Sequence, residues 1–297
     1  MTKIVYIAGY GHSGSTLYGV VLGGLQGNVN AGELHRLGTF KKVPRLNEPF
    51  ISPELERARV RLKKFIATAD PAFRKIAALE SIFSIRVRDA QRSTLRYNKF
   101  WGGVMDIIAQ ETGAEVLIDS SKTAWGQVQR PQLLRDAGHD IFLLHLVKDP
   151  QALVCSRTKK KGLINGAKSL LGWSITNWLT WRRYRAWGSR YMISIYDDFA
   201  RSPQAELEII GKFIGQDLAP SKARIEAGLG FASGLQFGGN RAGRHREVFW
   251  DPDLRSRREA APLPRLIGAV GLPLFHYLKM RQRDSEFLPP DGEGTMR

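Results

Sequence analysis

The fold is decided by residues 3–17, which read KIVYIAGYGHSGSTL. The first six residues of this stretch are mostly apolar and predict a short buried strand, and the residues from Thr16 onward predict a helix. A turn rich in glycine and serine separates the two. Glycines let backbone N–H groups approach an anion, and the dipole of the following helix favours negative charge at its first residue. This order of strand, glycine turn and helix therefore predicts a phosphate-binding loop.

Further strand-like runs lie at residues 116–119, 141–147 and 192–196. The first two are almost continuously apolar rather than alternating, which is typical of strands buried on both faces of a parallel sheet. Helices are predicted between the strands, at residues 16–25, from Ser52 to about residue 67, from Asp70 onward, at 93–112 and at 131–137. The alternation of strands and helices predicts an α/β fold in which helices flank a parallel sheet.

The length and composition favour one globular domain. The chain has 297 residues and 43% hydrophobic residues, which is ample for a buried core. We expect a single domain over residues 1–297, with a helical insertion or cap at about 41–112. The polar stretch at about 284–297 contains proline and glycine and is predicted to be a loose tail.

The charge balance predicts an anionic partner. Lys and Arg total 45 against 28 for Asp and Glu, a net charge of +17. Nucleic acid, a phosphorylated small molecule, an anionic polymer or a membrane surface would each satisfy this excess. The single cysteine, Cys155, suits a reducing compartment, and the sequence contains neither a signal peptide nor an apolar run long enough to span a membrane. We therefore expect a cytoplasmic protein.

The glycine loop differs from that of nucleoside triphosphatases at one decisive position. Gly9, Gly14 and Thr16 have the spacing of the pattern G-x-x-x-x-G-K-[ST], but Ser15 stands where that pattern has lysine. The lysine neutralises the β and γ phosphates of a nucleoside triphosphate. Its absence argues against phosphoryl transfer, although an atypical P-loop kinase remains an alternative.

The loop and two further segments resemble the sulfotransferases that use 3′-phosphoadenosine 5′-phosphosulfate (PAPS), nearest in motif to the bacterial and protein-tyrosine members. Residues 9–17 are similar to the family's 5′-phosphosulfate loop. Residues 142–157, FLLHLVKDPQALVCSR, are similar to its 3′-phosphate segment, where a cation ends a strand and a serine follows eight residues later. The pair Gly32-Glu33 is similar to the Gly-Glu that supplies the general base.

The resemblance implies a P-loop-like α/β fold and transfer of a sulfuryl group from PAPS to a hydroxyl, or less often an amine. The product would be 3′-phosphoadenosine 5′-phosphate (PAP), and no metal is required. It implies Glu33 as the base, with His12 and Lys122 stabilising the transition state or the leaving group. The implied donor-binding residues are Gly11, His12, Ser13, Gly14, Ser15, Thr16, Lys148, Ser156, Asn240 and Arg241.

Two positions depart from the family pattern. His12 stands where the loop usually has Arg or Lys, and a neutral imidazole supplies one donor in place of a fixed charge. Lys148 stands where the 3′-phosphate segment has Arg, which loses the bidentate fork of a guanidinium. Both changes weaken the match to the family pattern. The two positions still carry side chains that can bind an anionic phosphate.

The sequence also has features that other functions and partners would use. A non-enzymatic nucleic-acid-binding protein would also use the basic surface, and residues 173–190 interleave aromatic and basic side chains. However, Trp178, Trp181 and Tyr184 recur at helical spacing, which predicts a helix that packs these rings on the core, so nucleic acid is not the expected partner. The acceptor stays open among small molecules, glycans and lipids. Residues 263–278 are apolar with basic flanks and would allow peripheral contact with an anionic membrane.

Overall fold

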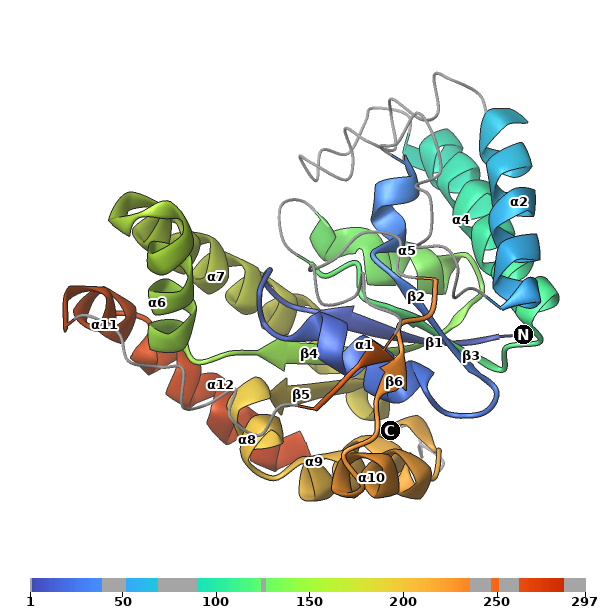
Figure 1. The fold of residues 1–297 in the computed structure, drawn as a ribbon. Helices are drawn as coiled ribbons and strands as arrows, with labels where there is room; N and C mark the ends of the chain where they lie inside the picture. Colours follow the sequence, from blue (N-terminus) through green and yellow to red (C-terminus); the bar gives the residue numbers. More distant parts are fainter. Residues whose placement is uncertain are drawn as a thin grey trace, which may run out of the picture. The chain divides into compact units, whose positions relative to one another are not determined.

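The computed structural model describes residues 2–38, 52–68, 90–123, 127–235, 247–250 and 262–285. Its strands β1 (Lys3–Ala8), β2 (Asn28–Gly32), β3 (Val116–Asp119), β4 (Asp140–Val147) and β5 (Tyr191–Ile195) form one sheet in the order β2-β3-β1-β4-β5 (Figure 1). β1 and β2 each pair with β3 in parallel, and β4 pairs with β5 in parallel. The predicted α/β fold with a parallel sheet flanked by helices is confirmed.

The strands with continuous apolar runs are buried, as their sequences predict. All four residues of β3 are buried, and β1 and β4 expose only part of their first residue. The predicted strands at 116–119 and 141–147 agree with β3 and β4, and the strand predicted at 192–196 lies one residue from β5. The sequence analysis missed β2, whose residues read NVNAG.

The chain divides into two compact units. The first unit contains residues 1–7, 15–142 and 223–250. Its helices are α1 (Ser15–Gly23), α2 (Pro53–Thr68), α4 (Ala90–Thr112) and α5 (Arg130–Asp136), with 3-10 turns η1 (Leu34–Gly38) and η2 (Gln127–Gln129). The short strands β6 (Phe231–Ala232) and β7 (Glu247–Val248) pair antiparallel.

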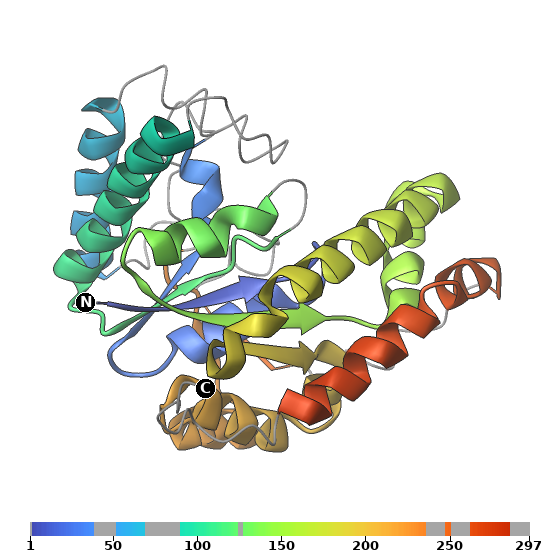
Figure 2. The ribbon, with the colours of Figure 1, turned by 180° about the vertical axis from the view of Figure 1, so that it is seen from behind.

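Helices α2 and α4 form the described part of the predicted insertion at 41–112. They lie side by side (Figure 1, Figure 2), and the rings of Phe65 and Phe100 stack between them with centroids 5.7 Å apart. The predicted start of α2 is confirmed, because the Leu55 amide donates to Ser52 Oγ at 3.4 Å and Pro53 is the first helical residue. The helix predicted from Asp70 onward lies outside the described residues.

The second unit contains residues 8–14, 143–222 and 251–297. Its helices are α6 (Pro150–Lys161), α7 (Leu163–Tyr184), η3 (Arg185–Arg190), α8 (Tyr196–Arg201), α9 (Pro203–Ile214), α11 (Pro262–Ala269) and α12 (Leu272–Ser285), and α10 (Ala219–Glu226) runs across the boundary between the units. Asp149 caps α6, since the Ala152 amide donates to its Oδ1 at 2.9 Å. The single-domain organisation stays a prediction.

Two sequence expectations for the second unit need qualification. Trp181 and Tyr184 of α7 pack in the core as predicted, but Trp178 is exposed. The tail predicted from about residue 284 begins inside α12, which reaches Ser285, and residues 286–297 lie outside the described part. Among the helices that the structure describes, none combines the length and apolar content needed to span a bilayer.

Candidate active site

The glycine loop leaves β1 at Ala8 and enters α1 at Ser15. Its backbone has positive φ at Gly9, His12 and Gly14, with 70° at His12. A non-glycine residue in this region is uncommon and is typical of ligand-binding turns. Buried Ser13 donates from Oγ to the Tyr10 carbonyl at 2.6 Å, which fixes the turn. Because α1 has no acidic residue in its first turn, the loop and the helix start fit an anion.

Glycine is required at two positions because neighbouring groups leave no room for a Cβ atom there. A Cβ at Gly9 would lie 2.3 Å from the Leu146 carbonyl oxygen, and one at Gly14 would lie 2.2 Å from ring carbons of Tyr196. At Gly11, by contrast, a Cβ would meet nothing within 4 Å. The loop therefore packs closely against β4 and Tyr196 and has open space at Gly11.

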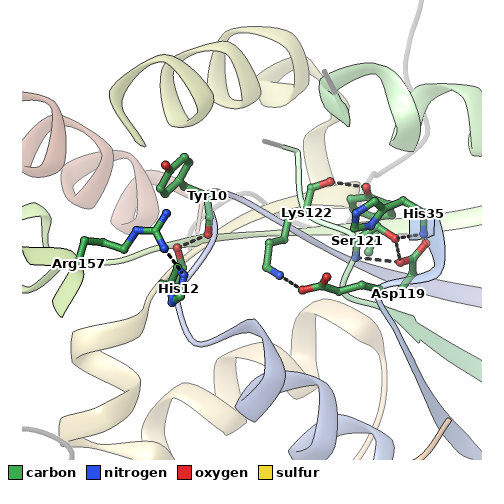
Figure 3. Close-up of polar contacts among 10 residues, drawn as sticks. Tyr10, His12, His35, Asp119, Ser121, Lys122 and Arg157 are labelled. Carbon is green, nitrogen blue, oxygen red and sulfur yellow. Dashed lines mark hydrogen bonds and ion pairs between the residues drawn. The ribbon is translucent and has the colours of Figure 1, made fainter. Parts of the chain in front are cut away.

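A cation that the sequence analysis missed lies beside the loop. Arg157 Nη1 lies 2.7 Å from His12 Nε2 (Figure 3). Arg157 Nε donates to Ser169 Oγ at 2.9 Å. A guanidinium has only donors, so Arg157 donates in this contact and Nε2 of His12 is placed as the acceptor. The fixed positive charge at the loop therefore belongs to Arg157. The one feature of the sequence that could have indicated Arg157 is its position directly after Ser156, at the end of the predicted 3′-phosphate segment.

The predicted 3′-phosphate segment lies at the end of β4 and along α6. The Lys148 ammonium lies 4.6 Å from the centroid of the Tyr196 ring. That ring is also the one that packs against Gly14. Tyr196, the first residue of α8, thus lies against both the glycine loop and Lys148. Ser156 lies half-buried on α6. The cation–π contact holds the Lys148 ammonium over the Tyr196 ring.

In the first unit, the structure brings together two residues that the resemblance singled out. Lys122 Nζ donates to Glu33 Oε1 in an ion pair (Figure 3). The two side chains are only 14% and 5% exposed, respectively. The pair comes from the segments that follow β3 and β2, which are neighbours in the sheet. A partly buried pair of this kind is stronger than a surface ion pair and fixes the direction of the carboxylate.

The backbone of Lys122 is anchored to β1. Lys122 adopts φ 66°. Its amide donates to the Ile7 carbonyl at 3.1 Å, and its carbonyl accepts a hydrogen bond from the Tyr6 hydroxyl. A lysine in the left-handed region persists only where its surroundings determine it, and such residues concentrate at ligand sites.

The turn that carries Glu33 is fixed by Asn30. The Gly32 amide donates to Asn30 Oδ1 at 3.2 Å, and Asn30 Nδ2 donates to the Ser233 carbonyl at 2.9 Å. Gly32 has φ 71°, a conformation that glycine adopts without cost. These bonds hold the chain immediately before Glu33.

The turn before Lys122 is fixed by a buried network around Asp119. Asp119 Oδ1 accepts from the Ser121 amide at 2.9 Å and from its hydroxyl, and Oδ2 accepts from Arg130 at 3.2 Å. The Arg130 guanidinium stacks over the Trp101 ring at 3.8 Å. Ser121 Oγ in turn accepts from the His35 amide at 3.0 Å (Figure 3). The network connects the segment after β3 to the segment after β2, and so supports both members of the Glu33–Lys122 pair.

Some predicted features fall outside this description. Asn240 and Arg241 lie outside the described residues. Within the described ranges, no group of three or more His, Cys, Asp or Glu side chains is placed to hold a metal ion.

The chain is similar in structure to three solved domains whose descriptions name them as sulfotransferases. The sulfotransferase domain from the Synechococcus PCC 7002 olefin synthase aligns over 92% of this chain and 96% of its own, with a TM-score of 0.51 and 20% identity. The sulfotransferase domain from the curacin biosynthetic pathway has a TM-score of 0.49 and 18% identity, over 97% of this chain and 99% of its own. Sulfotransferase STF9 from Mycobacterium avium has a TM-score of 0.45 and 14% identity, over 76% and 67%.

No protein-family model and no curated protein sequence matches the chain. At 20% identity, the likeness to the olefin synthase domain establishes the fold. Function must therefore be argued from the residues of the site.

Proposed function

We propose that the chain is a PAPS-dependent sulfotransferase that transfers a sulfuryl group to a hydroxyl or amine by in-line displacement. The observation that carries the proposal is the partly buried Glu33–Lys122 pair. An oriented carboxylate beside an ammonium supplies the two functions that such a transfer needs, a proton acceptor and a positive charge. The glycine loop, the Glu33 turn, Lys122 and Lys148 each follow the carboxyl end of a strand, where ligands bind in open α/β sheets.

The loop fits a nucleotide that has few phosphates in line. Ser15 leaves the loop without the lysine that a nucleoside triphosphate requires, and the neighbouring cation is Arg157. Open space at Gly11 and the acid-free first turn of α1 suit a 5′-phosphosulfate. A second cation, Lys148, on the Tyr196 ring that also borders the loop, suits a 3′-phosphate on the same nucleotide.

When bound, PAPS supplies a sulfuryl group whose bond to a phosphate oxygen breaks as PAP departs. Glu33 accepts the proton of the acceptor hydroxyl. The ammonium of Lys122 stabilises the negative charge that develops in the transition state or on the leaving group. His12, held by Arg157, and the loop residues Gly11, Ser13, Gly14, Ser15 and Thr16 hold the 5′-phosphate. Lys148 and Ser156 hold the 3′-phosphate, together with Asn240 and Arg241. This work is positioning and electrostatics, and a metal is not required.

We propose a cytoplasmic protein, since its one cysteine, Cys155, is buried and free. The acceptor is a small molecule, a glycan or a lipid with a hydroxyl or amine.

The test is transfer of radiolabelled sulfate from PAPS to a panel of phenol, sugar, lipid and peptide hydroxyls. We expect one class to take the label, and we expect Glu33→Gln to lower turnover about 10²–10⁴-fold with PAP affinity preserved. Exposed Glu115→Gln is the control and should leave turnover unchanged. Transfer from γ-labelled ATP with Mg²⁺, and none from PAPS, would replace the proposal with a kinase.

A further inference from the structure

One side of α7 carries large apolar side chains in solvent. Ile164, Leu171, Ile175 and Trp178 are 71%, 64%, 50% and 42% exposed. With exposed Lys168 and Arg182, they recur at intervals of four and three residues, which places all six on one side of a helix. We refer to Ile164, Lys168, Leu171, Ile175, Trp178 and Arg182 as the α7 face.

The opposite side of α7 is fixed in the core of the second unit. Trp173, Asn177 and Tyr184 are fully buried there. A Cβ at Gly172 would lie 2.8 Å from the Tyr10 ring, and Ser169 bonds to Arg157. The helix therefore cannot turn to bury the α7 face. Contiguous exposed apolar side chains of this kind mark an interaction site.

The segment of chain that contains the α7 face carries charge of one sign. Residues 150–196 contain nine Lys and Arg and no Asp or Glu. Lys160 and Lys161 are exposed just before the start of α7, and Arg182, Arg183 and Arg185 are exposed around its end. The surface that covers the α7 face must therefore be both apolar enough to take isoleucine and leucine and negatively charged.

This combination distinguishes among the candidate occupants. A second copy of this chain would bring the same positive charges against each other. Nucleic acid would pair with the cations but would leave the aliphatic side chains in water. A bilayer with anionic headgroups satisfies both requirements, because headgroups attract lysine and arginine while the acyl boundary takes the apolar side chains and the tryptophan.

Helix α11 and the residue that follows it add exposed apolar area to the same unit. Leu263 and Leu266 of α11 are exposed, as is Val270 just after the helix. α11 packs on α6, since a Cβ at Gly268 would lie 2.4 Å from the Cα of Gln151. Part of the 263–278 segment that the sequence indicated for membrane contact is thus anchored while these three apolar side chains remain in solvent.

We propose that the α7 face binds the anionic surface of a phospholipid bilayer, with Leu171, Ile175 and Trp178 inserted at the headgroup boundary and the flanking lysines and arginines on the headgroups. This binding is independent of the proposed transfer reaction.

The test is sedimentation of the purified full chain with vesicles of phosphatidylcholine alone or mixed with phosphatidylglycerol. We expect binding to the mixed vesicles only, weakened by salt, and a blue shift of tryptophan emission that Trp178→Phe reduces. Leu171→Gln with Ile175→Gln should weaken binding at least about ten-fold, and Lys160→Gln with Lys161→Gln should weaken it about ten-fold or more. The control is Leu229→Gln, since Leu229 is also 50% exposed but lies in the first unit.

Any one of three results would overturn the proposal. The first is no binding to the mixed vesicles at low salt, and the second is equal loss of binding in the Leu229 control. The third is a dimer that dissociates in the Leu171, Ile175 variant, measured by sedimentation velocity, because a second copy would then be the occupant. PAP affinity, measured on the same variants, should not change, so failure here leaves the transfer reaction untouched.

Discussion

The guanidinium of Arg157 lies against the loop histidine. Arg157 Nη1 is 2.7 Å from Nε2 of His12, and a guanidinium can only donate in such a contact. A sequence read without coordinates assigns the loop's cation to His12, since it occupies the family's cation position. In the structure, the fixed positive charge beside the loop is the guanidinium of Arg157, which contacts His12.

This contact predicts that Arg157→Gln weakens PAP binding about ten- to hundred-fold, the effect of one charge-assisted hydrogen bond. Arg157→Lys should recover part of the loss, because the charge returns without the fixed fork. Isothermal calorimetry with PAP measures both, and exposed Arg201→Gln is the control for loss of one surface charge. Equal affinities for PAP in Arg157→Gln and Arg201→Gln would show that Arg157 does not contribute to the anion site.

At the scale of the element, β2 shows why an apolar pattern in the sequence does not predict every strand of the sheet. Its residues NVNAG do not form an apolar run, yet Asn28 and Asn30 are buried. Asn28 Nδ2 donates to the Leu22 carbonyl at 2.8 Å, and Asn30 Nδ2 reaches the Ser233 carbonyl, 203 residues away in sequence. Burial of asparagine becomes favourable only with such partners, and a partner so distant leaves no local pattern.

Features with local causes were predictable. β1, β3 and β4 follow from their apolar runs, and α2 and α6 follow from a capping residue and proline at their starts. Glu33 and Lys122 were singled out by motif, and the structure pairs them. Arg157 and Tyr196 became apparent only when tertiary packing placed them on the glycine loop.

The loop's backbone predicts a contrast between two glycines with nearly the same φ. Gly14 has φ +91° with the Tyr196 ring in the way of a Cβ, whereas Gly138 has φ +92° with nothing within 4 Å. Gly138→Ala should cost only the left-handed strain, about 1 to 2 kcal/mol. Gly14→Ala should cost more in urea unfolding and should also abolish PAP binding, because the loop must shift. Equal costs, with PAP binding intact, would mean that the loop does not pack on Tyr196 as described.

At the scale of the whole molecule, a buried histidine couples folding to pH. His145 of β4 lies fully buried, with Nδ1 2.7 Å from the Tyr191 hydroxyl and Nε2 2.9 Å from Asn177 Oδ1. Burial lowers its pKa from 6.5 to about 4. The unfolded chain therefore binds a proton that the folded chain does not, and protonation favours unfolding.

The stabilising contribution of His145 is present above about pH 6.5 and is lost as the pH falls toward 4. We expect the free energy of unfolding to fall by about 2 to 3 kcal/mol between pH 8 and about pH 4.5 from this group. Urea unfolding at the two pH values measures the loss. His145→Gln should flatten that dependence, and exposed His276→Gln should not. The same pH dependence in wild type and His145→Gln would show that other groups cause the acid sensitivity.

The proposed activity itself rests on recognition of a nucleotide with both a 5′- and a 3′-phosphate. The most direct measurement is the ratio of calorimetric affinities for PAP and for adenosine 5′-monophosphate, which lacks the 3′-phosphate, in wild type and in Lys148→Ala. The account predicts that wild type prefers PAP by about ten- to hundred-fold and that Lys148→Ala loses most of this preference, with little change in affinity for the monophosphate. Equal affinities for the two nucleotides in wild type, or a ratio unchanged by Lys148→Ala, would contradict it.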